Sequence, residues 1–181
     1  HTTAASHNRV FIVEVMGHKV GWLTLYAGIA GGADIILLPE IPYDINKIVE
    51  AIQKRSKDGK GFTILAVAEG AISKEDAAYP SVSYEVADKI KEVCGTEVRV
   101  AVPGHTQRGG SPCPYDRVLC TRLGSAAAKA IIDEDYGCMI AMINNKTKRV
   151  PLGDVAGKLK MVDPDSQMIK EAKRIGISFG D

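Results

Sequence analysis

Short apolar runs alternate with amphipathic segments along most of the chain. The runs are rich in β-branched residues, which is typical of strands that are buried on both faces of a parallel sheet. The expected strands cover residues 9–16, 35–39, 62–68, 98–102 and 139–143. Because segments with helical character separate them, the pattern predicts right-handed βαβ units. The fold class is therefore α/β: a three-layer, Rossmann-like, mostly parallel sheet flanked by helices.

The segments between the runs carry helix signals. Asp44 is a good N-cap, and Ile45, Ile48 and Ile52 follow it at helical spacing. Glycines end several of these segments. The expected helices cover residues 21–30, 45–57, 84–94 and 115–133, and one or two amphipathic helices follow between 151 and 175. Residues 71–83 and 105–114 are expected to be irregular because they are polar or rich in glycine and proline.

Composition narrows the class of protein. The 181 residues are 45% hydrophobic and 25% charged, which is typical of a globular protein with its own core. The 23 Lys and Arg nearly balance the 22 Asp and Glu, so a strongly basic nucleic-acid binder is excluded. No apolar run reaches the roughly 18 residues of a membrane span. The chain begins at His1 without Met or a signal-peptide pattern, and we expect it to be part of a longer protein.

The four cysteines indicate the compartment. They are far apart in the sequence and form no CxxC pair, so we expect reduced thiols and no structural zinc. This usage favours a cytoplasmic protein.

Polar residues follow three of the expected strands. In a parallel sheet, ligands bind at the carboxyl ends of the strands. Met16, Gly17 and His18 would bring open backbone and a titratable ring to that edge. Glu69 ends the third strand, and as an ionised carboxylate it can only accept hydrogen bonds, which suits a sugar hydroxyl. A surface glutamate at a strand end remains the alternative.

The loop from Arg99 to Gly110 has the strongest local signal for a ligand. It combines two arginines, a histidine and three glycines. Arginine donates a planar fork of hydrogen bonds to phosphate, and glycines allow the backbone to approach an anion. A small phosphorylated ligand or a solvated turn both fit this composition. No GxGxxG, no GxxxxGK[ST] and no clear aspartate cluster for magnesium accompanies it.

Together these residues resemble the 6-phosphofructokinase family. The matching stretches, in the family's order, are Ser6-His7-x-Arg9, Val13-Glu14-Val15-Met16-Gly17, Ala30-Gly31-Gly32, Ala68-Glu69-Gly70 and Arg99-x4-Gly104-His105-Thr106-Gln107-Arg108-Gly109-Gly110-Ser111-Pro112-x-Pro114-Tyr115-Asp116-Arg117. The resemblance covers nearly the whole chain, as the C-terminal half of a phosphofructokinase.

The resemblance implies a set of ligands for fructose 6-phosphate. Arg9 and Arg99 are similar to two arginines that reach the 6-phosphate from a neighbouring subunit. His105 and Arg108 are similar to the phosphate ligands of the subunit that owns the site. The implied assembly is a homo-oligomer, a dimer or tetramer.

The sugar side of the implied site has one departure from the family pattern. Glu69 matches the carboxylate that binds the sugar hydroxyls, and Met16 and Gly17 match the backbone that lines the sugar. His18 stands where the familiar Met-Gly-Arg motif has arginine. We interpret it as a subfamily variant at the position near the transferred phosphoryl group. A non-catalytic, sugar-phosphate-binding regulatory subunit is the alternative.

The resemblance also implies the domain organisation and the reaction. Residues 1–106 would form the sugar-phosphate domain, 107–157 would pack on an absent N-terminal domain, and 158–181 would form a helical tail. The whole enzyme would phosphorylate fructose 6-phosphate to fructose 1,6-bisphosphate in glycolysis, with ATP or pyrophosphate as donor. The Mg²⁺ ion would be bound mainly by the missing N-terminal half, and this half-chain alone would be inactive.

The family's allosteric effector site is only partly matched. Asp34 and Lys60 are compatible with it, but Asp58 stands where a basic residue is expected. Control by ADP or phosphoenolpyruvate is therefore not expected.

Overall fold

The computed structural model describes residues 1–7, 9–73 and 81–181. The chain forms two compact units. The first comprises His1–Gln107 and Met161–Asp181, and the second comprises Arg108–Lys160. In the part of the chain that the structure describes, no helix is both long enough and apolar enough to cross a membrane.

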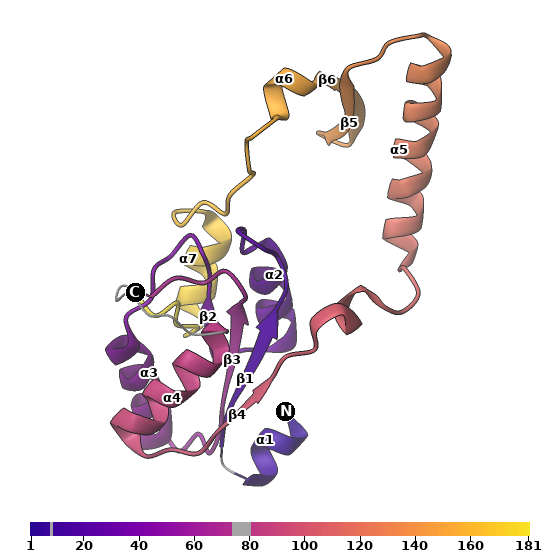
Figure 1. The fold of residues 1–181 in the computed structure, drawn as a ribbon. Helices are drawn as coiled ribbons and strands as arrows, with labels where there is room; N and C mark the ends of the chain where they lie inside the picture. The colour runs from indigo at the N-terminus through magenta and orange to yellow at the C-terminus, as the bar shows by residue number, and fades with distance from the viewer. Residues whose placement is uncertain (8, 74–80) are drawn as a thin grey trace. The chain divides into compact units, whose positions relative to one another are not determined.

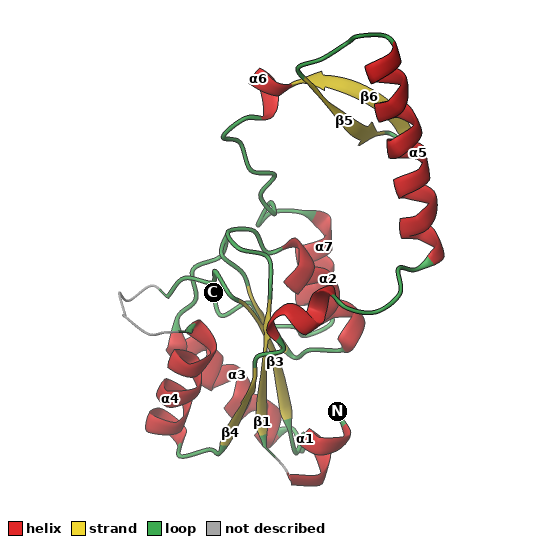
Figure 2. Ribbon diagram, turned by 45° about the vertical axis from the view of Figure 1, so that its right-hand side comes forward, coloured by secondary structure: helices red, strands yellow, loops and turns green. Residues whose placement is uncertain are grey.

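The first unit is built on a four-stranded parallel sheet (Figures 1 and 2). Its strands are β1 (Val10–Val15), β2 (Ile35–Leu37), β3 (Thr63–Ala68) and β4 (Val98–Ala101). They lie in the order β2-β3-β1-β4, and all three pairings are parallel. The predicted strands, and with them the α/β class, are confirmed to within two residues at each end.

Helices cover both faces of this sheet. They are α1 (Thr2–His7), α2 (Trp22–Gly31), α3 (Ile45–Lys57), α4 (Val82–Cys94) and α7 (Gln167–Arg174). Apolar residues of α3 and α4 share one buried cluster with β1, β2 and β3. Those of α2 and α7 share a second cluster with β2 and β3. The sheet is thus the middle of three layers, and its central strands β1 and β3 are mainly apolar because both faces are covered, with Glu14 and Thr63 as the exceptions.

Capping explains where several helices begin and end. The Asp44 carboxylate accepts a hydrogen bond from the Asn46 amide at 2.8 Å, as expected for the N-cap of α3. Gly32 and Gly95 end α2 and α4 in the left-handed conformation. Helix α4 begins at Val82, two residues before its predicted start. The rest of the predicted irregular segment 71–83 includes residues 74–80, which lie outside the described residues.

The second unit consists of α5 (Pro114–Ile132), the strands β5 (Cys138–Ile143) and β6 (Lys146–Pro151), and the short helix α6 (Leu152–Val155). Strands β5 and β6 form an antiparallel hairpin. Asn144 and Asn145, between the strands, both have positive φ, as a tight two-residue hairpin turn requires. The sequence analysis missed β6 and this turn. The prediction of an irregular segment over residues 105–114 is wrong at its start, where Gly104–Arg108 forms a 3₁₀ helix, η1.

Candidate functional site

The loops after β1 and β3 leave the sheet toward opposite faces. Strand β1 leads into α2, whose apolar residues belong to one buried cluster, and β3 leads to α4, whose apolar residues belong to the other. Strands β1 and β3 are neighbours, with Val15 opposite Ala68. Such a switch point opens a crevice at the carboxyl ends of the two strands, and this is where ligands bind in parallel sheets.

Two glycines shape the turn that follows β1. Gly17 has φ of 151°, and a Cβ there would lie 2.6 Å from the Val20 carbonyl oxygen. Gly70 follows β3, and its Cβ would lie only 2.1 Å from the His18 carbonyl oxygen. The two loops therefore pack backbone against backbone, which only glycine permits. His18 itself has φ of 54° and is exposed.

The Glu69 carboxylate holds this turn. Its Oε1 accepts hydrogen bonds from the Gly17 amide at 3.1 Å and from the His18 amide at 2.7 Å. Hydrogen bonds to an ionised acceptor are the stronger kind, so the two bonds fix the turn at the edge of the sheet. Neither the sugar-hydroxyl role nor the surface-glutamate alternative considered for Glu69 included this contact with the backbone.

Gln107 is a site residue that the sequence analysis missed. Its side-chain oxygen accepts from the Met16 amide at 3.0 Å, and its side-chain nitrogen donates to the Glu14 carbonyl at 3.4 Å. The amide group thus binds the end of β1 as a further strand would. The signal available in the sequence was its place within the matching stretch from Arg99 to Arg117.

These groups surround a pocket of about 200 Å³. It is lined by Glu14, Met16, Glu69, Val102, Gly104, His105 and Gln107. The volume is below the roughly 300–1,000 Å³ of sites for drug-sized ligands, so the pocket suits a small polar molecule. Of the predicted site residues, Met16, Gly17, His18, Glu69 and His105 are brought to this edge of the sheet.

Arg9 and Arg99 lie toward the other end of the sheet. Arg9 precedes β1, Met16 follows it, and Arg99 pairs with Phe11 near the start of β1. The six residues of β1 span about 20 Å. The Glu97 carboxylate bonds both arginines, with its Oε2 at 2.8 Å from Arg9 and its Oε1 at 2.6 Å from Arg99. The two arginines therefore form a cluster separate from the pocket of their own chain.

Arg108 is the first residue of the second unit and is exposed. Its role as a phosphate ligand remains a prediction.

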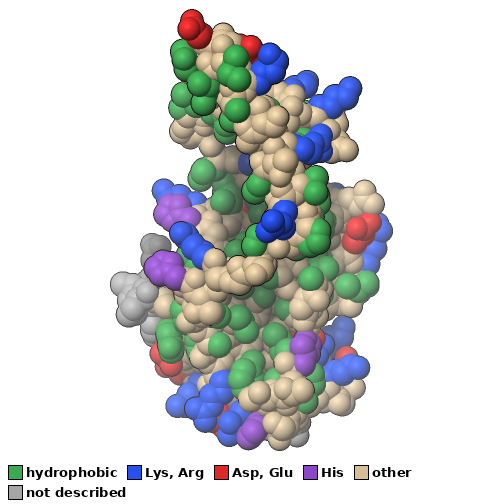
Figure 3. Space-filling view, turned by 90° about the vertical axis from the view of Figure 1, so that its right-hand side faces the viewer, with side chains coloured by type: hydrophobic (Ala, Val, Ile, Leu, Met, Phe, Trp, Pro, Cys, Tyr) green, Lys and Arg blue, Asp and Glu red, His purple; other side chains and the backbone are tan. Residues whose placement is uncertain are grey.

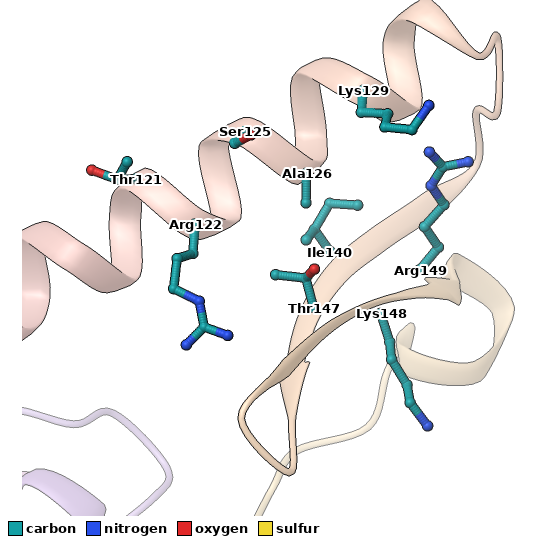
Figure 4. A pocket seen from close by; sticks show the side chains of 9 residues that line it. All are labelled: Thr121, Arg122, Ser125, Ala126, Lys129, Ile140, Thr147, Lys148 and Arg149. Atoms are coloured by element: carbon teal, nitrogen blue, oxygen red, sulfur yellow. The ribbon is translucent and has the colours of Figure 1, made fainter.

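A larger pocket, of about 570 Å³, lies in the second unit between α5 and the hairpin (Figure 4). It is lined by basic residues, but three of them have partners nearby. Arg149 bonds Asp133 and Asp135, Lys129 bonds Asp133, and Arg122 bonds Asn145. The Asp133 pKa is lowered, mainly by the hydrogen bond from Arg149. Because Arg149 and Lys129 are already paired with carboxylates, and because the smaller pocket lies at the carboxyl ends of the parallel strands, we take the smaller pocket as the candidate site for a phosphorylated ligand.

Two other ligands come into question, an allosteric effector and a metal ion. Asp34, the candidate effector ligand, bonds the Arg55 guanidinium at 2.8 Å and accepts from the Ile64 amide at 2.9 Å. Among residues 1–7, 9–73 and 81–181, no group of three or more His, Cys, Asp or Glu side chains could hold a metal ion.

The fold and the site define a doubly wound α/β domain with polar groups at its switch point. The phosphofructokinase family model matches residues 1–131. An ATP-dependent 6-phosphofructokinase from Spirochaeta thermophila is 51% identical over the whole chain, which covers 53% of that protein. For ATP-dependent 6-phosphofructokinase 3 of Bacteroides thetaiotaomicron, the identity is 47% over 99% of the chain and 53% of that protein.

Solved structures show the same relationship. The phosphofructokinase structure from Saccharomyces cerevisiae matches 84% of this chain and 21% of its own, with a TM-score of 0.75 and 39% identity. The chain belongs to the phosphofructokinase family. It spans about half the length of the curated relatives that it matches.

Proposed function

We propose that this chain is the fructose 6-phosphate-binding part of a 6-phosphofructokinase. The whole enzyme transfers a phosphoryl group to fructose 6-phosphate and yields fructose 1,6-bisphosphate, a step of glycolysis in the cytoplasm. The observation that carries the proposal is the pocket at the switch point, where the Glu69-held turn, His105 and Gln107 meet. The name of the relative from Spirochaeta thermophila supports the reaction. The four free cysteines support the cytoplasmic location.

In this proposal each group has a defined role. The sugar lies against the backbone of Met16 and Gly17, and the Glu69 carboxylate both holds this backbone and accepts from sugar hydroxyls. His105 and Arg108 bind the 6-phosphate. His18 lies at the edge of the pocket that faces the transferred group, where its ring can donate a hydrogen bond.

Arg9 and Arg99 bind the 6-phosphate held by a second copy of the chain. The register of the sheet supports this role because the arginines and the pocket lie toward opposite ends of β1. One copy therefore contributes to two sites, and the active enzyme is at least a dimer.

The second unit packs on the part of the protein that this chain does not contain. Its surface supports this role, since Figure 3 shows hydrophobic side chains exposed over it. Tyr115, Ile131, Ile132 and Tyr136 are each more than 60% exposed. A monomeric protein rarely leaves so many large apolar side chains in water.

ATP is the proposed donor, because the curated relatives from Spirochaeta thermophila and Bacteroides thetaiotaomicron are named as ATP-dependent enzymes. The Mg²⁺ ion, which neutralises charge on the transferred phosphoryl group when bound, belongs to the part of the enzyme outside this chain. The Asp34–Arg55 ion pair supports the expectation that ADP and phosphoenolpyruvate are not effectors here.

Assay of the full-length protein tests the proposal. Fructose 6-phosphate is supplied with ATP and Mg²⁺, or with pyrophosphate and Mg²⁺, and fructose 1,6-bisphosphate is measured. We expect turnover with ATP. Turnover with pyrophosphate alone would overturn the choice of donor, and sugar-phosphate binding without turnover would favour the regulatory subunit.

A further inference from the structure

A single carboxylate holds the two arginines that face the neighbouring site. The two Glu97 oxygens each bond a different guanidinium, that of Arg9 through Nη2 at 2.8 Å and that of Arg99 through Nη2 at 2.6 Å. Each guanidinium carries five N–H donors, so one contact with Glu97 leaves further donors for a ligand. The three charges sum to +1, which still attracts a phosphate dianion.

The backbone fixes Glu97 between its partners. Its carbonyl oxygen accepts from the Val10 amide at 3.3 Å, directly after Arg9. Glu97 immediately precedes β4, in which Val98 and Val100 pack against the core while Arg99 between them is exposed. The backbone of Glu97 is thus anchored beside Arg9 by its hydrogen bond to the first residue of β1.

Without Glu97, two like charges would stand on neighbouring strands with no anion between them. The side chain of Arg99 is 56% exposed, so it would be free to turn into solvent away from Arg9. A phosphate would then have to order both long side chains itself. Ordering each such side chain weakens binding by a few-fold to about tenfold.

We propose that Glu97 is a positioning residue that sets the Arg9–Arg99 pair for the 6-phosphate of the neighbouring copy. This inference rests on the proposed function. Glu97 touches neither sugar nor donor, so it acts on the affinity for fructose 6-phosphate and not on the chemical step.

The test is steady-state kinetics of the full-length protein with Glu97→Gln, which removes the charge but keeps the size of the side chain. We expect the KM for fructose 6-phosphate to rise about three- to tenfold. The kcat and the KM for the donor should stay within about twofold. Glu97→Asp, which retains the charge, should restore most of the affinity.

Two controls separate the positioning of the arginines from a general effect of removing one negative charge. Glu92→Gln removes an equal charge from an exposed residue of α4, for which the described part of the chain shows no ion pair, and should leave the KM unchanged. In an Arg99→Ala background, Glu97→Gln should add little, because one of the two cations to be positioned is gone.

Other outcomes would overturn the inference. An unchanged KM in Glu97→Gln would mean that the arginines need no carboxylate, and a lower KM would mean that Glu97 competes with phosphate. An equal rise of the KM for fructose 6-phosphate in Glu97→Asp and Glu97→Gln would mean that the length of the side chain matters and its charge does not. If the unaltered enzyme does not use fructose 6-phosphate, the proposed function itself fails, which is a separate result.

Discussion

Replacing Gly70 by alanine tests the packing of the two loops at the switch point. The new Cβ would lie 2.1 Å from the His18 carbonyl oxygen, whereas ordinary contacts are 3.4–4 Å. The turn after β1 must therefore shift by more than 1 Å. A shift of that size, directed away from β3, breaks the bonds from Gly17 and His18 to Glu69, which are 3.1 and 2.7 Å long.

The expected loss follows from these contacts. A misplacement of about 1 Å in a substrate-positioning group costs on the order of 100-fold in rate. We expect kcat/KM for fructose 6-phosphate to fall about 100-fold in full-length Gly70→Ala. Strain of this kind destabilises a fold by about 1–3 kcal/mol, which denaturant unfolding would measure.

Gly31→Ala is the matched control. Its Cβ meets nothing within 4 Å, and its φ is not in the left-handed region. It should leave kcat/KM unchanged and stabilise α2 slightly, because alanine favours the helix. If Gly70→Ala kept kcat/KM within about threefold of the control, the argument that backbone contact positions the turn would be refuted.

Three other predictions rest on single side chains. Glu69→Gln keeps an acceptor but removes its charge, so kcat/KM for fructose 6-phosphate should fall about tenfold or more in steady-state assays. Asp44→Ala removes the N-cap of α3 and should lower the free energy of unfolding by about 1 kcal/mol in urea titration. Burial, reinforced by Glu85, raises the pKa of Tyr43 to about 12, so the folded state keeps its proton while the unfolded state ionises near pH 10. Stability should then fall by about 2–3 kcal/mol between pH 10 and 12, and a Tyr43→Phe variant should lack that loss in unfolding measured across the range.

The sheet and its helices could be predicted because their signals are local. Strands β1 to β3 are mainly apolar runs, β4 alternates around Arg99, and helices α2 and α4 end at Gly32 and Gly95. Strand β6 was missed because five of its six residues are exposed, so it has no apolar alternation to recognise.

The groups that order the site could not be found in this way. Gln107 bonds a backbone amide 91 positions earlier, and Glu97 bonds Arg9 across a strand pairing. Neither contact leaves a periodic pattern. Parallel pairing aligned the strand ends, so Glu69 and Gly17 could be predicted to meet, but the bond between them came only from the three-dimensional arrangement.

The length of β1 has a genetic consequence under the proposed assembly. Since the arginines precede the strand and the pocket follows it, a defect at one end of a copy impairs a different site from a defect at the other end. In a mixed dimer of two such defective copies, one site collects both defects and the other collects none. Two inactive alleles of this gene could therefore complement each other, whereas two alleles defective at the same end could not.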